Sequence, residues 1–284
     1  MSFEMTIILV SAICAAIGVG GYFMFRSFNI LVIFLSLCVS ILIWGLWMGH
    51  PSNFKDGIIR HDPYPGNILG TIHTGGPLVG ALMACLLVAI TYIIERQLSI
   101  RRAQGAGDTI MFLKGLQTNL EHSNVRGAIA ECEKRRGAIS NIMRSGLERY
   151  EQIHNDTEYD AEKKIAEVQR AIDEAVNLET PLLEKNLVIL STVSSIATMI
   201  GLLGTTVGMI RAFAALGASG GAVSAQALSI GISEALYNTA FGLAAAIISI
   251  VAYNFFTSKV DNFVYMIDEA ILSVMEILTI KVKK

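Results

Sequence analysis

Long uncharged apolar stretches alternate with one highly charged region along this chain. A helix needs roughly 20 mostly apolar residues to cross a bilayer. The sequence meets that requirement five times and so predicts five membrane spans: Met5–Phe25, Ser27–Trp47, Pro77–Ile94, the interval from Lys185 to Arg211, and Ala225–Phe256. The last two stretches are longer than a bilayer requires, so their helices should extend into the cytoplasm.

The charged residues are concentrated in one part of the chain. Of 22 basic and 24 acidic residues, 28 lie between Arg96 and Glu184. Only 16% of the chain is charged and 53% is hydrophobic, whereas about 25% charge is usual in soluble domains. The fold class expected is therefore an all-α membrane protein with a helical soluble region between its spans. A net charge of −2 gives no nucleic-acid signature.

The predicted organisation has eight parts. They are a two-span hairpin (1–48), a periplasmic loop (49–75), a third span (76–95), a helical cytoplasmic region (96–184), a fourth span (185–216), a periplasmic link (217–224), a fifth span (225–257) and a C-terminal cytoplasmic helix (258–284). The first stretch has no basic segment before it, so we expect it to be retained in the hairpin rather than cleaved as a signal peptide.

Basic residues near the span ends set the expected orientation, because Lys and Arg concentrate on the cytoplasmic side of a membrane. Such residues follow the third and fifth spans, lie in the first hairpin and close the chain: Arg26, Arg96, Arg101, Arg102, Lys259, Lys281, Lys283 and Lys284. All of them fall on one side if the N-terminus is periplasmic and the C-terminus is cytoplasmic.

The charged region has local signals for helices. Asp108 and Asn124 stand where helix N-caps are expected, and a further helix is predicted over Ala138–Tyr150. An amphipathic helix follows, with one apolar stripe formed by Ile165, Val168, Ile172 and Ala175. Pro181 is expected to kink this helix where it leads into the fourth span.

The stretch GLLGTTVGM, Gly201 to Met209, has two readings. Its glycines and threonines are compatible with a phosphate-binding loop, but such a loop needs a lysine for the phosphates. The stretch has none, and it lies inside a charge-free run with no basic residue before Arg211. The sequence therefore favours one face of a membrane helix.

Small residues recur along one face of each of the last two spans. In the fourth span they are Ser194, Thr198, Gly201, Thr205, Gly208 and Ala212, and in the fifth Ala235, Thr239, Gly242, Ala246 and Ser249. Small faces let membrane helices approach closely, and their hydroxyls can bond across the contact. Such stripes are also explained by helix packing alone.

Three polar groups lie among these small residues. Thr205 and Thr239 are expected within roughly 5 Å of each other in depth, at 1.5 Å rise per residue, where they could border a polar path. Glu234 is the only acid within a span core, and such a residue is usually paired or part of an ion route. A salt bridge to Arg211 is the simplest alternative, and Asn238, one turn away, could extend the network.

Other site chemistry is not indicated. Cys14, Cys38, Cys85 and Cys132 have no ligand spacing and are interpreted as small buried hydrophobes. His122 and His154 are isolated. We therefore expect no metal site, no cofactor and no enzyme activity.

The two final spans resemble a known family. GLLGTTVGMIRAF, then SIGISEALYNTAFGLAAAI and VAYNFF, are similar in order and spacing to the last two spans of the MotA/TolQ/ExbB proton-channel family. ITYIIERQLSIRRA resembles the first conserved span of that family, so the likeness covers about residues 76–284. The first two spans are extra to the three-span ExbB/TolQ plan, and the PGNILG…GGPLVG stretch is similar to longer ExbB-like proteins of Bacteroidota.

The resemblance implies an ion-conducting stator subunit in the bacterial inner membrane. It implies a homopentamer around a dimer of ExbD/TolR-like single-span subunits, with the titrating aspartate on the partner. Thr205 and Thr239 then line the path, and Glu234 matches the family's glutamate. Proton flow, with Na⁺ as the alternative ion, is expected to drive work on a TonB-like periplasmic protein. A flagellar or gliding stator of MotA type and an unrelated secondary transporter are the competing interpretations.

Overall fold

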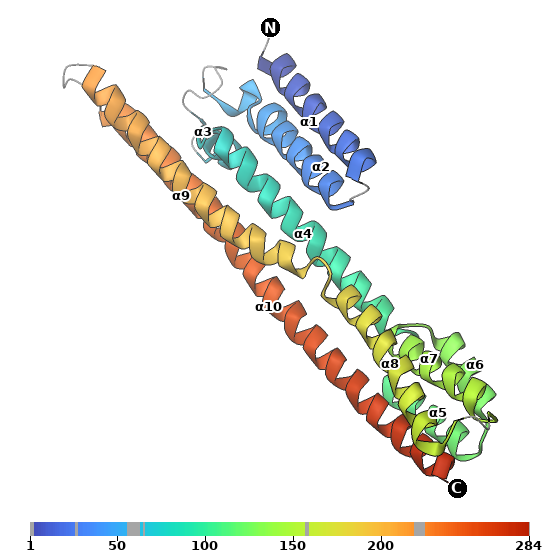
Figure 1. The fold of residues 1–284 in the computed structure, drawn as a ribbon. Coiled ribbons are helices and arrows are strands. Elements are labelled where there is room, and N and C mark those ends of the chain that lie inside the picture. Colours follow the sequence, from blue (N-terminus) through green and yellow to red (C-terminus); the bar gives the residue numbers. More distant parts are fainter. Residues whose placement is uncertain are drawn as a thin grey trace. The chain divides into compact units, whose positions relative to one another are not determined.

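The computed structural model describes residues 3–25, 28–55, 63–64, 66–156, 159–218 and 225–283. These residues are almost entirely helical, and their only β pairing is an isolated bridge between Phe54 and Pro63 (Figure 1). The chain forms two compact units, which we call the apolar unit (Met1–Ile93 and Val188–Tyr253) and the charged unit (Ile94–Leu187 and Asn254–Lys284). The predicted all-α fold class is confirmed.

The apolar unit begins with a helical hairpin. α1 (Phe3–Phe25) packs along α2 (Phe28–Leu42), and the Cys38 thiol donates to the Ser11 carbonyl at 3.0 Å. α2 ends in a π-helical turn, Ile43–Met48. A hydrogen bond from the Ser40 hydroxyl to the Gly80 carbonyl joins α2 to α4 (Pro77–Gln104).

Four helical stretches in the described residues are long and apolar enough to cross a membrane. They are Asn29–Met48, Pro77–Glu121, Ala161–Ala214 and Gly231–Val282, with a shorter apolar stretch at Ile7–Gly20. The chain is therefore a multi-pass membrane protein, and the number of five spans stays a prediction.

The segment between α2 and α4, expected as a loop, contains ordered short helices where it is described. A 3₁₀ turn covers Pro51–Asn53, and α3 covers Ile68–Thr74. Asn67 caps α3 because its Oδ1 accepts from the backbone N–H groups of Leu69 and Gly70. Asn67 also donates through Nδ2 to Asn53 Oδ1 at 3.1 Å.

The remaining helices of the apolar unit are the longest in the chain. α9 covers Leu187–Ala218 and α10 covers Ala225–Lys283. α8 (Ala161–Glu184) continues through Pro181, and the kink expected at that residue stays a prediction. The chain leaves helical conformation at Lys185 and Asn186, where Asn186 has φ +67°. Asn tolerates this left-handed conformation better than most residues.

The charged unit contains α5 (Thr109–Glu121), α6 (Val125–Arg135), α7 (Ala138–Ile153) and α8, with the ends of α4 and α10. The predicted caps are confirmed: Asp108 accepts from the Ile110 N–H, and Asn124 accepts from the Gly127 N–H. The amphipathic stripe of α8 buries Val168 and Ile172. Local capping and periodicity therefore predict this unit well.

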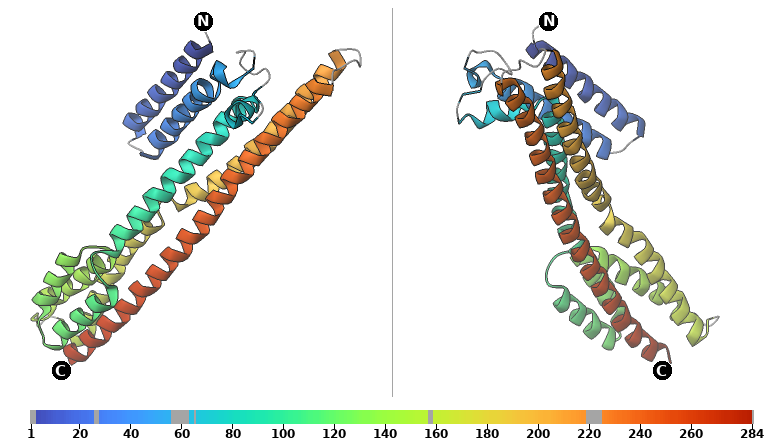
Figure 2. Two further views of the ribbon diagram at one scale, coloured as in Figure 1. Left: turned by 180° about the vertical axis from the view of Figure 1, so that it is seen from behind. Right: turned by 90° about the vertical axis from the view of Figure 1, so that its left-hand side faces the viewer.

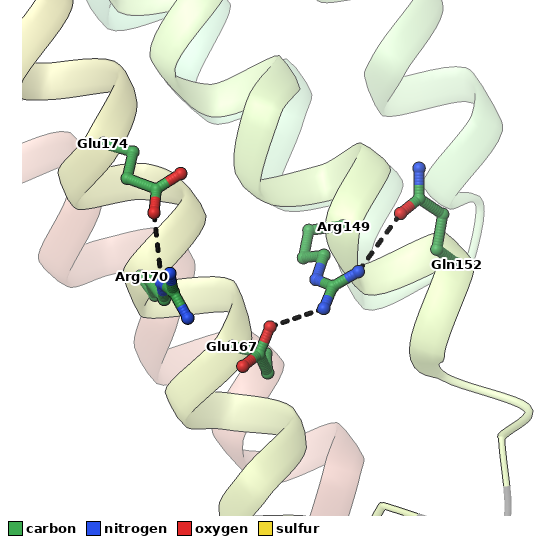
Figure 3. A network of polar contacts seen from close by, with 5 residues as sticks. All are labelled: Arg149, Gln152, Glu167, Arg170 and Glu174. Carbon is green, nitrogen blue, oxygen red and sulfur yellow. Dashed lines mark hydrogen bonds and ion pairs between the residues drawn. The ribbon is translucent and has the colours of Figure 1, made fainter.

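Charged side chains connect α7 to α8 at the surface of this unit (Figure 3). Arg149 on α7 donates through Nη2 to Glu167 on α8, and through Nη1 to Gln152 at 3.5 Å. Arg170 and Glu174 form a separate pair along α8 at 3.0 Å. The Arg149–Glu167 contact is therefore the one in this group that links two helices.

A buried arginine binds a carbonyl in the last turn of α8. Arg96 is 2% exposed, and its guanidinium binds the Glu95 carboxylate through Nε and Nη2. Its Nη1 donates to the Leu183 carbonyl at 3.4 Å, in the last turn of α8 where carbonyls have no helical partner. Arg96 thus links α4 to α8.

Candidate ion-path residues on α9 and α10

α9 and the first half of α10 run alongside each other in every view (Figures 1 and 2). Their backbones touch at Gly201 and Gly242. A Cβ added at Gly242 would stand 2.7 Å from the Ala197 carbonyl oxygen and 2.9 Å from the Gly201 Cα. Only glycine fits at this distance, so the two helices approach as closely as a small-residue contact allows.

The contact continues in both directions from this point. Toward the cytoplasmic side predicted from the sequence, the Ser194 hydroxyl donates to the Ala246 carbonyl at 3.0 Å. Toward the other end, a Cβ at Gly208 would meet the Ala235 Cβ at 2.8 Å, and one at Gly231 would meet the Ala212 Cβ at 2.8 Å. Most of the two small-residue stripes therefore lie in one interface.

Thr198 is the member of the stripe that lies outside this contact. Its side chain is exposed, and its hydroxyl donates to Ser194 of its own helix. Residues spaced alternately three and four apart do not stay exactly in line on a regular helix, because their direction turns by about 20° every seven residues. Some residues of such a stripe therefore lie at the edge of the helix contact.

The two threonines of the predicted path have different partners. The Thr239 hydroxyl crosses the interface and donates to the Gly201 carbonyl at 3.2 Å. The Thr205 hydroxyl donates to Leu202 of its own helix at 2.7 Å, and its side chain is partly exposed. Thr206 is exposed and donates to Leu203. Thr239 thus lies in the contact between α9 and α10, and Thr205 at its border.

Glu234 forms an ion pair with Arg211. The Glu234 Oε1 lies 2.8 Å from the Arg211 Nη1, and the carboxylate-bearing side chain is 17% exposed against 54% for the arginine. A charged group in a membrane span is costly unless it is paired. The pair joins α9 to α10 at the level where the sequence predicts the periplasmic side, and its part in ion transfer stays a prediction.

Asn238 lies one turn from Glu234 and is 1% exposed. Its Nδ2 donates to the Glu234 carbonyl at 3.0 Å and to the Gly75 carbonyl at 2.9 Å. Gly204 makes room for this side chain, since a Cβ there would stand 2.3 Å from the Asn238 Cβ.

The small-residue stripes did not indicate Gly204 and Gly75, the two glycines that contact Asn238. Gly204 falls off the small-residue stripe, although its place as the second glycine of GLLGTTVGM was a signal for it. Gly75 acts through its backbone carbonyl and is 163 positions from its partner, so no side-chain pattern could indicate it.

The residues of this site are hydroxyl, amide, guanidinium and carboxylate groups between two tightly packed membrane helices. Among the described residues, no group of three or more metal-ligating side chains occurs. Such an arrangement can border a narrow polar path or hold two membrane helices together.

Comparison with known proteins assigns the class. The pattern of the MotA/TolQ/ExbB proton channel family matches residues 134–269. An ExbB-like biopolymer transport protein of Synechocystis is 30% identical over 190 residues, which cover 65% of this chain and 82% of that protein. The chain belongs to the MotA/TolQ/ExbB proton channel family.

Two further relatives bear ExbB and TolQ names. The Tol-Pal system protein TolQ of Pseudomonas aeruginosa is 29% identical over 178 residues, covering 63% of this chain and 76% of TolQ. The biopolymer transport protein ExbB of Xanthomonas campestris is 42% identical over 95 residues, covering 34% of this chain and 37% of that protein. The family match begins at residue 134, so the extra N-terminal spans remain a prediction from the sequence.

Proposed function

We propose that this chain is the pore-forming stator subunit of an ExbB–ExbD or TolQ–TolR-like motor in the bacterial inner membrane. Five copies surround a dimer of single-span ExbD/TolR-like subunits, with each N-terminus periplasmic and each C-terminus cytoplasmic. Protons cross between the pentamer and the dimer, and the resulting motion does work on a TonB-like periplasmic protein in outer-membrane transport. The chain itself needs no cofactor and carries out no enzyme reaction.

The α9–α10 contact is the observation that supports this proposal. The contact is tight enough to exclude everything except backbone and small side chains, and Thr205 borders it with a partly exposed side chain. Large apolar residues lie exposed on the outer faces of both helices, including Met199, Leu202 and Leu236. Together these features suit a rigid wall that meets lipid or further helices rather than a transporter that opens between α9 and α10.

The proposal assigns the proton-carrying group to the partner. Threonine hydroxyls do not titrate in the physiological range, and the one acid of the site is paired with Arg211. A carboxylate on a partner helix, facing Thr205 and Thr239, completes the path. One proton crossing 100 mV supplies about 2.3 kcal/mol, so a few protons can drive a mechanical step.

Two measurements test the proposal. Native mass spectrometry of the complex in mild detergent is expected to show five copies of this chain with two copies of a smaller single-span subunit. The same complex in proteoliposomes should carry protons inward under a potassium diffusion potential, reported by an internal pH dye. A monomer or dimer without a small partner would instead favour the transporter interpretation.

A further inference from the structure

The Asn238 side chain connects the predicted ion path to the segment between α2 and α4. One hydrogen of its Nδ2 serves the carbonyl of Glu234 within α10, and the other serves the carbonyl of Gly75 just after α3. All of these atoms belong to the apolar unit. The amide therefore bridges the helix that carries Glu234 and Thr239 to a segment outside the family match at residues 134–269.

That segment is held in place by its own contacts. The His73 ring is fully buried and stacks on the Trp44 ring, with centroids 4.7 Å apart and planes 13° apart. Phe54 meets His73 edge-on at 5.7 Å, and Asn53 donates to the Trp47 and Met48 carbonyls at the end of the π-helical turn. We call residues 43–55 and 66–76 the outer segment.

Apolar packing brings the outer segment onto α10 beside Asn238. Trp44, Met48 and Val79 form a buried cluster, and Phe241 of α10 packs against it. A Cβ at Gly75 would lie 3.5 Å from the Tyr237 Cβ. The hydrogen bond from Asn238 thus stands inside a contact made by three neighbouring positions of α10: 237, 238 and 241.

We infer that the outer segment sets the position of the ion-path helix through Asn238, which is a positioning residue for Glu234 and Thr239. Asn238 is flanked by these two residues on α10 and bonds the Glu234 carbonyl directly. Holding Asn238 on Gly75 fixes how far this part of α10 can rotate or slide. This inference rests on the proposed function and gives the outer segment a role in it.

An opposing interpretation is that Asn238 touches the ion itself. Its Oδ1 is buried and accepts no hydrogen bond from the residues that the structure describes. A direct ion contact would use this oxygen, whereas positioning uses Nδ2. A covalent tether can replace the hydrogen bond from Nδ2 to Gly75 but cannot replace Oδ1. It should therefore restore function if Asn238 positions α10, and should not if Asn238 contacts the ion.

The tether is a disulfide between cysteines placed at Gly75 and Tyr237. Cβ atoms in disulfides lie about 3.8 Å apart, close to the separation found here. The variants to compare are Asn238→Ala, the Gly75→Cys/Tyr237→Cys pair, and both together, each purified in complex with its small partner. The two single-cysteine variants show whether either new thiol pairs with a native cysteine, and peptide mass spectrometry measures the cross-link.

If Asn238 positions Glu234 and Thr239, its removal should lower proton flux in proteoliposomes and the cross-link should restore it. Asn238→Ala should lower proton flux about tenfold, the change that corresponds to losing one buried hydrogen bond of typical strength. A Cβ at position 75 disturbs the same contact, so flux in the reduced pair should also fall. The oxidised pair and the oxidised triple variant should reach the same higher flux, and a reductant should abolish this recovery. Low flux despite a complete cross-link, a pair that does not cross-link, or wild-type flux in Asn238→Ala would each overturn the inference.

Gly75→Ala gives an independent measurement if Asn238→Ala does not accumulate. The new Cβ would meet the Val79 Cγ2 at 2.5 Å and the Ile72 carbonyl at 3.2 Å, so Val79 or the Gly75 backbone must shift and the contact beside Asn238 is disturbed. Gly80→Ala is the matched control, because its Cβ would make ordinary contact with Trp44 at 3.7 Å. Reduced flux in Gly75→Ala alone supports the inference, and equal flux in the two variants overturns it. A wild-type complex that carries no protons would contradict the proposed function and not the inference about Asn238. In that case, the cross-link would still show whether positions 75 and 237 lie side by side.

Discussion

The Thr239 hydroxyl donates a hydrogen bond to the Gly201 carbonyl across the α9–α10 contact, at 3.2 Å. A carbonyl in the middle of a helix already accepts one bond from within that helix, so this is a second bond to the same oxygen. The hydroxyl is therefore held at the interface, and its oxygen keeps lone pairs that can accept a further hydrogen bond.

The first prediction concerns the two path threonines. Thr205→Ala and Thr239→Val should each reduce proton flux of the reconstituted complex by at least about tenfold, because each removes a hydroxyl that we propose lines the path. The pentamer should still form, since alanine is smaller than threonine and valine keeps its branched shape. Flux in proteoliposomes and native mass spectrometry measure the two outcomes.

Thr206→Ala is the matched control for these variants. Thr206 is the neighbour of Thr205, is exposed and bonds its own helix in the same way. It should retain flux. A similar loss in all three variants, or wild-type flux in both Thr205→Ala and Thr239→Val, would contradict the lining role.

The second prediction concerns the Glu234–Arg211 pair. Glu234→Ala should impair flux more than Glu234→Gln, since glutamine keeps a hydrogen-bond acceptor for Arg211 whereas alanine leaves the guanidinium without one. Equal, wild-type flux in both variants would mean that the pair only joins the helices.

Exchanging the two residues tests whether the ion pair only joins the helices or whether Glu234 also takes part in proton transfer. The Arg211→Glu/Glu234→Arg double variant keeps an ion pair between α9 and α10 but moves the acid to α9. If Glu234 takes part in proton transfer, the exchanged protein should assemble and fail to conduct. Normal flux in the exchanged protein would restrict the pair to a structural role.

Features that depend on neighbouring residues could be predicted from the sequence. The caps at Asp108 and Asn124 and the stripe of α8 need only a few adjacent positions, and all are confirmed. The small-residue spacing likewise indicated which faces of α9 and α10 would meet. The Arg211–Glu234 contact could be named as well, because few charged groups lie near one another in the spans.

Features that depend on distant backbone atoms could not be predicted. The bond from Asn238 to Gly75 uses a carbonyl, which every residue has, so nothing in the sequence marks it. The same holds for Arg96 and the Leu183 carbonyl: the sequence shows a basic residue after a span but not its burial. The turn between α8 and α9 depends on the positive φ of Asn186, whereas the local signal in the sequence was Pro181.

The third prediction tests the closeness of α9 and α10. Gly242→Ala places a Cβ 2.7 Å from a carbonyl oxygen and 2.9 Å from a Cα, and backbone atoms cannot move aside without separating the helices. Overpacking of this kind costs about 1–3 kcal/mol. We expect a lower melting temperature in detergent and a weaker pentamer by native mass spectrometry.

Gly217→Ala provides the comparison for Gly242→Ala. Among the described residues, no atom lies within 4 Å of a Cβ at Gly217, and alanine favours helix over glycine by up to about 1 kcal/mol. Its melting temperature should be unchanged or slightly raised. A Gly242→Ala protein as stable as this control would show that the helices are farther apart than described.

The last prediction concerns the link between α7 and α8. Hydrogen bonding and charge attraction from Arg149, aided by Arg170, hold the pKa of Glu167 below its ordinary value of 4.5. A carboxyl group with a lowered folded-state pKa stabilises the fold above its unfolded-state pKa, and this stabilisation is lost as the pH falls through the folded-state value. Glu167→Gln should therefore lower the melting temperature at pH 7, with the difference from wild type shrinking below pH 4.5.

Glu174→Gln is the control, because its pair with Arg170 lies along a single helix and is largely exposed. This variant should melt close to wild type at both pH values, and an equal loss in the two variants would contradict a specific role for the link between α7 and α8.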